Sequence, residues 1–134
     1  MPKRAVIGAI AVAVLAVFAA MKSSDLSSQQ AADPFGIASA QTRFAAALEI
    51  LPSSGVIGYL SDLPAGENAG SIAYMAAQYA VAPRAIVPVE KSPVEWALGN
   101  FARPGNFAER GAQAGFRLVH DFGNGVVVYR RARP

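Results

Sequence analysis

The sequence predicts a small α/β domain with a mixed sheet, in which parallel strands and a C-terminal antiparallel hairpin are flanked by helices, preceded by one N-terminal transmembrane helix. Three observations lead to this prediction. An uncharged apolar stretch opens the chain, short apolar segments alternate with longer segments of helical periodicity, and two apolar segments near the C-terminus flank a Gly-Asn-Gly turn. Alternating strands and helices favour parallel pairing, and a tight glycine turn between strands favours a hairpin.

The N-terminal stretch has the pattern of a membrane anchor. Residues 5–21 are 17 apolar residues without a charge, and a helix of that length nearly spans the ~30 Å hydrocarbon core of a bilayer. Lys3 and Arg4 precede the stretch, and only Lys22 follows it before Arg43. The positive-inside rule then leaves the N-terminus in the cytoplasm. We therefore expect a single-pass protein of the cell membrane whose C-terminal domain is extracytoplasmic.

Two other interpretations of this stretch stay open. Its basic start, apolar centre and small residues near Ala19 also fit a signal peptide, whose cleavage would leave a secreted or periplasmic domain. The third interpretation is a buried helix of a cytoplasmic domain. Residues 23–33 are polar and rich in Ser and Gln, which is typical of a flexible linker. The expected organisation is an anchor or signal peptide over residues 1–22, a linker over 23–33 and a soluble α/β domain over 34–134.

The domain is expected to begin with a helix, a strand and a second helix. Asp33 and Pro34 favour a helix start, and the apolar spacing after them predicts a helix over residues 34–50. Residues 55–60 form a short apolar run that predicts a buried strand. An alanine-rich helix is expected over residues 70–82. Its buried face is expected to contain Ile72, Met75, Ala76 and Tyr79, and Tyr74 and Gln78 lie near that face.

The middle of the domain is expected to add two strands and a short helix. A second strand is predicted over residues 85–89, at a sheet edge or ending there, because Pro88 has no N–H to donate. A third strand is predicted over residues 96–101. A short helix is then expected over residues 107–114 with Asn106 as its N-cap.

The C-terminal hairpin is the clearest local signal. Residues 116–122 and 126–130 are predicted strands joined by a tight two-residue turn. Because side chains alternate along a strand, such a turn places His120 on the more apolar face. The opposite face is expected to hold Arg117, Asp121 and Arg130.

Composition and motifs exclude several functional classes. The chain has no cysteine, so it has no disulfide, thiolate nucleophile or Cys-ligated metal. One histidine and scattered carboxylates do not predict a metal site, and without a glycine-rich phosphate-binding motif no cofactor is expected. The net charge is +3. The positive side chains are spread along the chain, apart from clusters at residues 3–4 and 130–133. The basic end over residues 130–133 has the chemistry to contact anionic headgroups or phosphate, although basic termini are commonly only solvated. No basic stripe is interleaved with aromatic residues, so nucleic-acid binding is not expected.

Polar residues at the ends of the predicted strands are the candidates for a ligand site. Ligands of open α/β sheets bind beyond the carboxyl ends of parallel strands. Ser61 and Asp62 follow the first strand, Glu90 follows the second and Asn100 ends the third. The alternative is that Asp62 and Asn100 cap the following turns.

His120, the one histidine, is also a candidate ligand-binding residue. Its alternative is a packed, hydrogen-bonded side chain. No catalytic residue is expected, because no serine lies in a glycine elbow and the adjacent Asp121 would point to the other face of the strand.

Four segments of the body carry a resemblance. They are ILPSSGVIGYLSD (Ile50–Asp62), AYMAAQYAVAPRAIV (Ala73–Val87), ALGNFA (Ala97–Ala102) and FRLVHDFGNGVVVYRR (Phe116–Arg131). Together they resemble soluble α/β segments associated with multi-spanning glycosyltransferase-like membrane proteins of bacteria. The resemblance implies an accessory domain, because the sequence lacks the multi-span bundle such transferases need, and it carries over no catalytic residues.

The sequence therefore predicts a non-catalytic, membrane-anchored extracytoplasmic module that binds an envelope protein or a glycan-type ligand. The alternative is a small envelope enzyme, or a glycosyltransferase-associated remnant, acting at the carboxyl ends of the strands. A third hypothesis is a structural partner in a membrane complex, whose anchor packs through small residues such as Gly8 and Ala9 against other helices.

Overall fold

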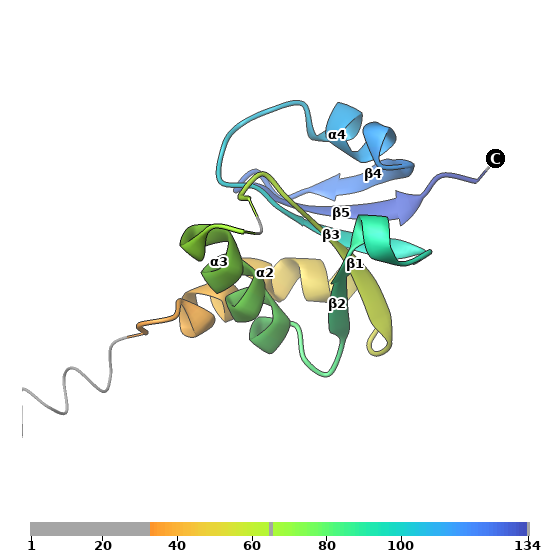
Figure 1. Ribbon diagram of the computed structural model, residues 1–134. Coiled ribbons are helices and arrows are strands. Elements are labelled where there is room, and N and C mark those ends of the chain that lie inside the picture. Colours follow the sequence, from red (N-terminus) through yellow and green to blue (C-terminus); the bar gives the residue numbers. More distant parts are fainter. Residues whose placement is uncertain (1–32, 65, 134) are drawn as a thin grey trace, which may run out of the picture. The chain divides into compact units, whose positions relative to one another are not determined.

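The computed structural model describes residues 33–64 and 66–133, which contain one five-stranded sheet (Figure 1). The strands are β1 Val56–Ser61, β2 Ala85–Pro88, β3 Trp96–Asn100, β4 Phe116–Asp121 and β5 Val126–Arg131. Their order in the sheet is β2-β1-β3-β5-β4. β1 pairs in parallel with β2 and β3, whereas β5 pairs antiparallel with β3 and β4. The predicted mixed sheet is confirmed, with Pro88 on an edge strand.

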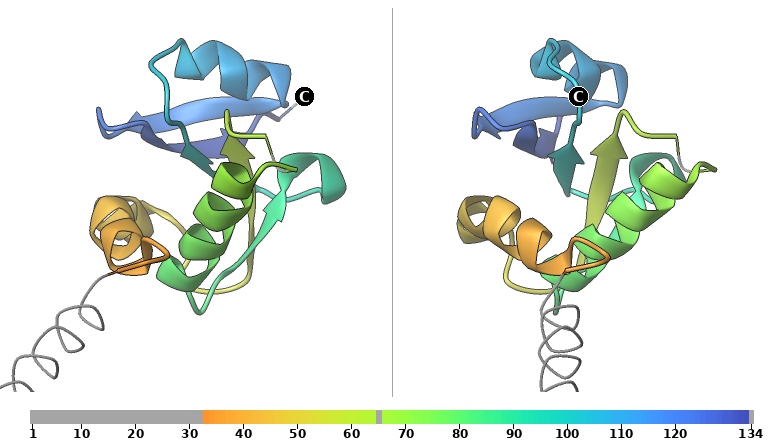
Figure 2. Two further views of the ribbon diagram at one scale, coloured as in Figure 1. Left: turned by 60° about the vertical axis from the view of Figure 1, so that its left-hand side comes forward. Right: turned by 90° about the vertical axis from the view of Figure 1, so that its left-hand side faces the viewer.

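Helices cover both faces of the sheet, so the described domain has three layers (Figure 2). One face is covered by α2 (Ile37–Ile50) and α3 (Asn68–Ala80), and the other by α4 (Phe107–Gln113). A single 3₁₀ turn, η1 (Val89–Lys91), follows β2. The predicted N-cap of α4 is confirmed, because the Asn106 side chain accepts a hydrogen bond from the N–H of Glu109.

The predicted transmembrane helix falls within residues 1–32, outside the described residues. In the part of the chain that the structure describes, no helix has both the length and the apolar character needed to cross a bilayer.

The first core lies between the sheet and the helix pair α2 and α3. Phe44 of α2 is 1% exposed and packs with apolar side chains that alternate along the strands. On β5, Val126 and Val128 face this core, while Val127 and Tyr129 face the opposite one. Because β5 is buried on both faces, its four consecutive apolar residues are all buried.

The second core lies between the sheet and α4, and Tyr129 is at its centre. Its ring is fully buried, and its hydroxyl donates a 2.7 Å hydrogen bond to the carbonyl of Phe107. A Cβ atom at Gly99 of β3 or at Gly111 of α4 would collide with this ring. The two glycines therefore let α4 and the sheet close around the tyrosine.

Side chains of α3 cover the outer edge of β2, the edge strand of the sheet. Gln78 accepts a 2.8 Å hydrogen bond from the N–H of Ile86, and its amide donates to the carbonyl of Arg84. The Tyr74 hydroxyl donates to the carbonyl of Ile86 at 2.7 Å. These bonds satisfy backbone groups that an edge strand otherwise presents to other chains.

The predicted ends and faces of the two larger helices need correction. α2 begins at Ile37, three residues after the predicted Pro34, because Gly36 adopts a left-handed φ of 69° and precedes the first helical residue. α3 buries its small residues, not its large ones. Its buried residues are Gly70, Ala76, Ala77 and Ala80. The predicted core residues Ile72, Met75 and Tyr79 are exposed by 47%, 56% and 62%.

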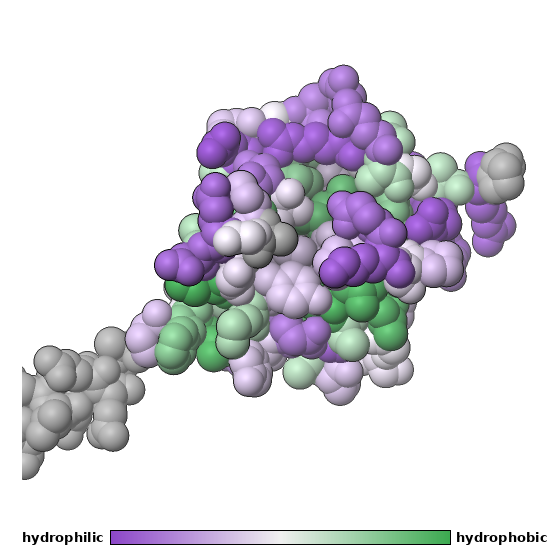
Figure 3. Space-filling view, viewed as in Figure 1, coloured by the Kyte–Doolittle hydropathy of each residue, from purple (hydrophilic) through white to green (hydrophobic). Residues whose placement is uncertain are grey.

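Packing through small side chains brings α3 close to α2 and the sheet and turns its bulky apolar face outward. In Figure 3, hydrophilic side chains gather over the upper part of the molecule, where α4 lies. Apolar side chains appear lower down, over α3 and β2.

The hairpin turn is longer than predicted, which changes the faces of two residues. The N–H of Phe122 donates to the carbonyl of Val126, so three residues form the turn instead of two. A β-bulge between Leu118 and His120 restores the predicted pairing farther from the turn. His120 is therefore exposed beside the ring of Phe122 and does not lie on the face of Tyr129. Asp121 pairs with Val127, so it does not share a face with Arg117 and Arg130. Its carboxylate accepts a hydrogen bond from the N–H of Gly123 in the turn.

Candidate functional site

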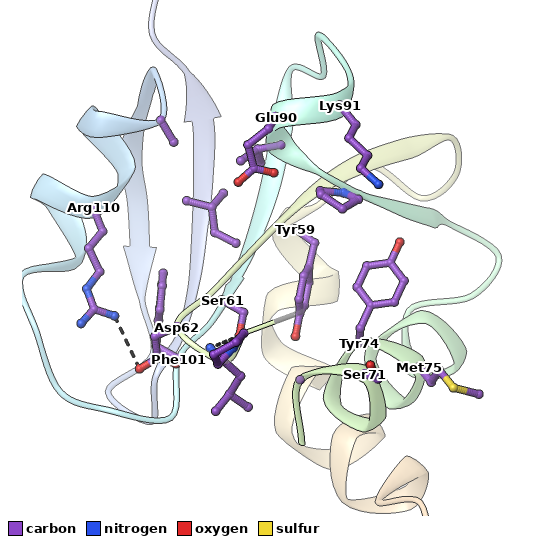
Figure 4. Close-up of a pocket in the computed structure, with 17 residues that line it drawn as sticks. Tyr59, Ser61, Asp62, Ser71, Tyr74, Met75, Glu90, Lys91, Phe101 and Arg110 are labelled. Atoms are coloured by element: carbon purple, nitrogen blue, oxygen red, sulfur yellow. Dashed lines mark hydrogen bonds and ion pairs between the residues drawn. The ribbon is translucent and has the colours of Figure 1, made fainter. Parts of the chain in front are cut away.

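A cavity of about 790 Å³ lies beyond the carboxyl ends of β1 and β2 (Figure 4). Its walls come from the end of β1, the start of α3, η1 and α4. This volume is within the range of ~300–1,000 Å³ that is typical of small-molecule sites.

The topology explains why the cavity is at this position. β1 and β3 are parallel neighbours, but after β1 the chain enters α3 on one face of the sheet, and after β3 it enters α4 on the other. A crevice opens where two parallel strands send their chains to opposite faces, and such crevices are the usual ligand sites of open α/β sheets.

Aromatic and aliphatic side chains form much of the cavity wall. The rings of Tyr59 and Tyr74 meet edge to face with centroids 5.3 Å apart. Pro88, Val89 and Phe101 add apolar surface from β2, η1 and the segment after β3. Tyr59 and Phe101 are only 7% and 4% exposed, whereas Tyr74 is half-buried.

Four charged residues line the same cavity, and their formal charges cancel. Asp62 and Arg110 form an ion pair with an N–O separation of 3.6 Å, and Glu90 and Lys91 extend from η1 (Figure 4). Glu90 and Lys91 are exposed, and neither has an ion pair with any residue of 33–64 or 66–133. Their side chains are therefore available to a ligand.

Arg110 is held at the cavity wall by Phe101 and Asp62. Its guanidinium lies over the ring of Phe101, 5.0 Å from the centroid. The Nη1 atom is buried but makes no hydrogen bond within the described chain, because its 3.6 Å separation from Asp62 is too long for one. Because Nη1 has less than 1 Å² of exposed surface, its partner is the Asp62 carboxylate and not a ligand in the cavity.

Asp62 holds the end of β1 to the segment between β3 and α4. Its two carboxylate oxygens accept hydrogen bonds of 2.8 and 2.9 Å from the N–H groups of Ala102 and Arg103. Desolvation acts to raise the pKa of Asp62, but these backbone hydrogen bonds and the charge of Arg110 outweigh it and lower the pKa below its usual value. Asp62 is therefore ionised at neutral pH.

The lowered pKa of Asp62 predicts a specific pH dependence of stability. Because the folded-state pKa lies below the ordinary value of 3.8, the carboxylate stabilises the fold fully above that pH, and this contribution disappears as the pH falls through the folded-state pKa. Asp62→Asn is expected to lower the free energy of unfolding by about 2 kcal/mol at pH 7, since charge-assisted hydrogen bonds are weakened. In urea titrations the difference from wild type should shrink below pH 3.8. A difference independent of pH would contradict the assignment.

Asn100 acts on the cavity through Tyr59. Its amide donates a 2.9 Å hydrogen bond to the Tyr59 hydroxyl. Burial raises the pKa of Tyr59, against the smaller opposite effects of its hydrogen bonds with Asn100 and Ser61 and the charge of Arg43. The hydroxyl is neutral at physiological pH and orients the ring that lines the cavity.

The structure brings together most of the residues predicted from the sequence. Ser61 and Asn100 are register partners on adjacent parallel strands, and Ser61, Asp62 and Glu90 line the cavity. Asp62 does not cap the turn that follows it, as the alternative expected, because its carboxylate accepts hydrogen bonds from the N–H groups of Ala102 and Arg103. His120 is not part of this site, since β5 and β3 separate its strand from β1.

Sequence reasoning missed Arg110, Lys91 and the aromatic wall. Tyr74, expected near the buried face of its helix, packs against the core, bonds β2 and also lines the cavity. The spacing of Arg110 in α4 gave no sign that the helix would cross the end of β1. Lys91 lies next to Glu90, and the position of that pair after a strand was the one available signal.

Among the described residues, no group of three or more His, Cys, Asp or Glu side chains is arranged to hold a metal ion. The fold and the site together define a three-layer α/β domain with a cavity at the carboxyl ends of its parallel strands. No protein-family model, curated protein or solved structure matches the chain.

Proposed function

We propose that this protein is a membrane-anchored extracytoplasmic module that binds a neutral, glycan-type ligand in the cavity beyond β1 and β2. The observation that carries the proposal is the combination of an apolar wall, which includes the half-buried Tyr74, with charges that cancel. The membrane anchor and the extracytoplasmic side rest on the N-terminal sequence pattern alone. Protease added to intact spheroplasts is expected to digest the domain, and protection of the domain would contradict this placement.

A sugar ring matches both parts of the cavity. Its C–H faces pack against the half-buried Tyr74 ring and the side chains of Pro88 and Val89, and its hydroxyls both donate and accept hydrogen bonds. Glu90 supplies acceptors and Lys91 supplies donors. Because two acidic and two basic side chains line the cavity, a neutral ligand leaves the charges balanced.

The geometry supports binding better than the alternative of catalysis. A general acid or base needs a pKa near the working pH and a free proton site. Both oxygens of Asp62 already accept backbone hydrogen bonds, and its lowered pKa keeps the group ionised. The hydroxyl of Ser61 accepts a hydrogen bond from the N–H of Leu63, and His120, the one histidine of the chain, lies on β4.

Saturation-transfer NMR with the full chain tests the proposal. The protein is held in a polyoxyethylene detergent, which contains no sugar, and is presented with glucose, galactose, mannose, N-acetylglucosamine and glucuronic acid. We expect saturation of the ring protons of a neutral sugar and weaker transfer to glucuronic acid. Lys91→Ala should weaken binding about tenfold, the effect of losing one charge-assisted hydrogen bond.

The matched control is Arg103→Ala, which removes one positive charge from an exposed residue outside this cavity. Its affinity should equal that of wild type. Absence of transfer to every neutral sugar, or equal losses in the two variants, would contradict the proposal.

A further inference from the structure

Four arginines line a second groove, with a volume of about 330 Å³, near the β4–β5 end of the sheet. They are Arg117, Arg130, Arg131 and Arg133. Arg117 comes from β4 and the others from β5 and the segment after it. Arg117 and Arg130 are direct register partners on antiparallel strands. The fold therefore brings Arg117 to the three basic residues of the C-terminal end.

Two of the four guanidinium groups are held in place by structural contacts. Arg130 lies over the ring of Trp96, 5.0 Å from its centroid, and bonds Glu95 through Nε and Nη2. Arg131 lies 4.7 Å from the centroid of Phe116 and donates a 2.7 Å hydrogen bond from Nε to the carbonyl of Val94. Because side chains alternate along β5, Arg130 lies on the face of Trp96 and Arg131 on the opposite face with Phe116. A guanidinium carries five N–H donors, so the bonds to Glu95 leave three on Arg130 for a ligand.

The groove has an excess of positive charge. Glu95 supplies the one carboxylate that pairs with these arginines among residues 33–64 and 66–133. Like charges at directly opposite positions of an antiparallel pair are destabilising. The cross-strand pair of Arg117 and Arg130 therefore favours an anion that bridges them.

We propose that this groove binds a phosphate group. The planar forks of Arg117 and Arg130, which are register partners on one face of the sheet, match the oxygens of a phosphate in pairs, and the prepositioned guanidinium of Arg130 reduces the entropy lost on binding. The volume accommodates a phosphate with a small substituent. The phosphate belongs either to a phospholipid headgroup or to a free soluble anion. This proposal is independent of the glycan-binding cavity.

Calorimetric titrations of the full chain in a polyoxyethylene detergent distinguish the two sources. The probes are inorganic phosphate and dihexanoyl-phosphatidylglycerol below its critical micelle concentration, each at an ionic strength matched with sodium chloride. Binding of the lipid but not of inorganic phosphate identifies a headgroup site. Binding of inorganic phosphate with equal or greater affinity identifies a soluble anion. Either result supports the site only if the arginine variants weaken it.

Arg117→Gln and Arg133→Gln are each expected to weaken binding about fivefold or more, because both side chains are exposed and neither is needed for packing. Arg103→Gln removes the same charge elsewhere on the surface and should bind as wild type does. Failure of both probes to bind, or equal affinities in all three variants, would overturn the proposal. Circular dichroism confirms that each variant is folded.

Discussion

Replacing Tyr129 by alanine is expected to lower the free energy of unfolding by about 3–5 kcal/mol, the usual loss for a large buried aromatic side chain. The Tyr129 ring is fully buried and fills the space between β3 and α4 that Gly99 and Gly111 leave open. Neither glycine has a side chain that could fill the space left when the tyrosine ring is removed. Domains of this size are stable by about 5–15 kcal/mol, so urea denaturation should show a strongly shifted midpoint.

Tyr129→Phe separates the ring from its hydroxyl. It keeps the packing and loses the hydrogen bond to Phe107, so we expect a loss of about 1 kcal/mol. Burial raises the pKa of Tyr129 to about 12. The protonated Tyr129 hydroxyl therefore contributes fully to stability below pH 10, and this contribution is lost as the pH rises toward 12. The phenylalanine variant should not show this loss. If Tyr129→Ala lowered the free energy of unfolding by less than about 1 kcal/mol, the close packing of the core between α4 and the sheet would be contradicted.

Filling the cavity is expected to abolish sugar binding without unfolding the protein. Ser71 is an exposed residue of α3 that lines the cavity, and a tryptophan there would occupy space that the ligand needs. Ser71→Trp should reduce the affinity for the neutral sugar by about a hundredfold or more, because overlap with a bulky side chain forfeits most contacts in the site. Saturation transfer and the urea midpoint are measured on the same sample.

Tyr79→Trp is the matched control on the same helix. Tyr79 is 62% exposed and does not line the cavity, so the tryptophan should leave both affinity and stability unchanged. Normal sugar binding by Ser71→Trp would place the ligand elsewhere on the domain. Equal losses in the two variants would indicate a general effect of added apolar surface.

Most of the fold could be predicted because local patterns and tertiary packing agree. The short apolar runs at β1, β2 and β3, the proline on the edge strand and the Asn106 cap all follow from single-residue chemistry. The faces of α3 could not be predicted from periodicity. Apolar residues lie on both sides of this helix, and close approach through Ala76, Ala77 and Ala80 decides which side is buried.

The candidate site could be predicted only where a strand end fixes a residue in space. Ser61, Asp62 and Asn100 meet because parallel strands end at the same edge. Arg110 reaches that edge from a helix 48 residues after Asp62, and nothing in its local sequence encodes the contact. His120 was displaced from its expected face by a three-residue turn and a bulge, which act on register and not on composition.

Backbone amide NMR during titration with the sugar that shows saturation transfer tests the central claim most directly. We expect the shifts to concentrate at the end of β1, the first turns of α3 and η1, around Tyr59, Ser71 and Lys91, which line the cavity. The amides of β4 should not move. Shifts spread over the whole domain, or confined to the hairpin, would contradict a glycan-binding cavity beyond β1 and β2.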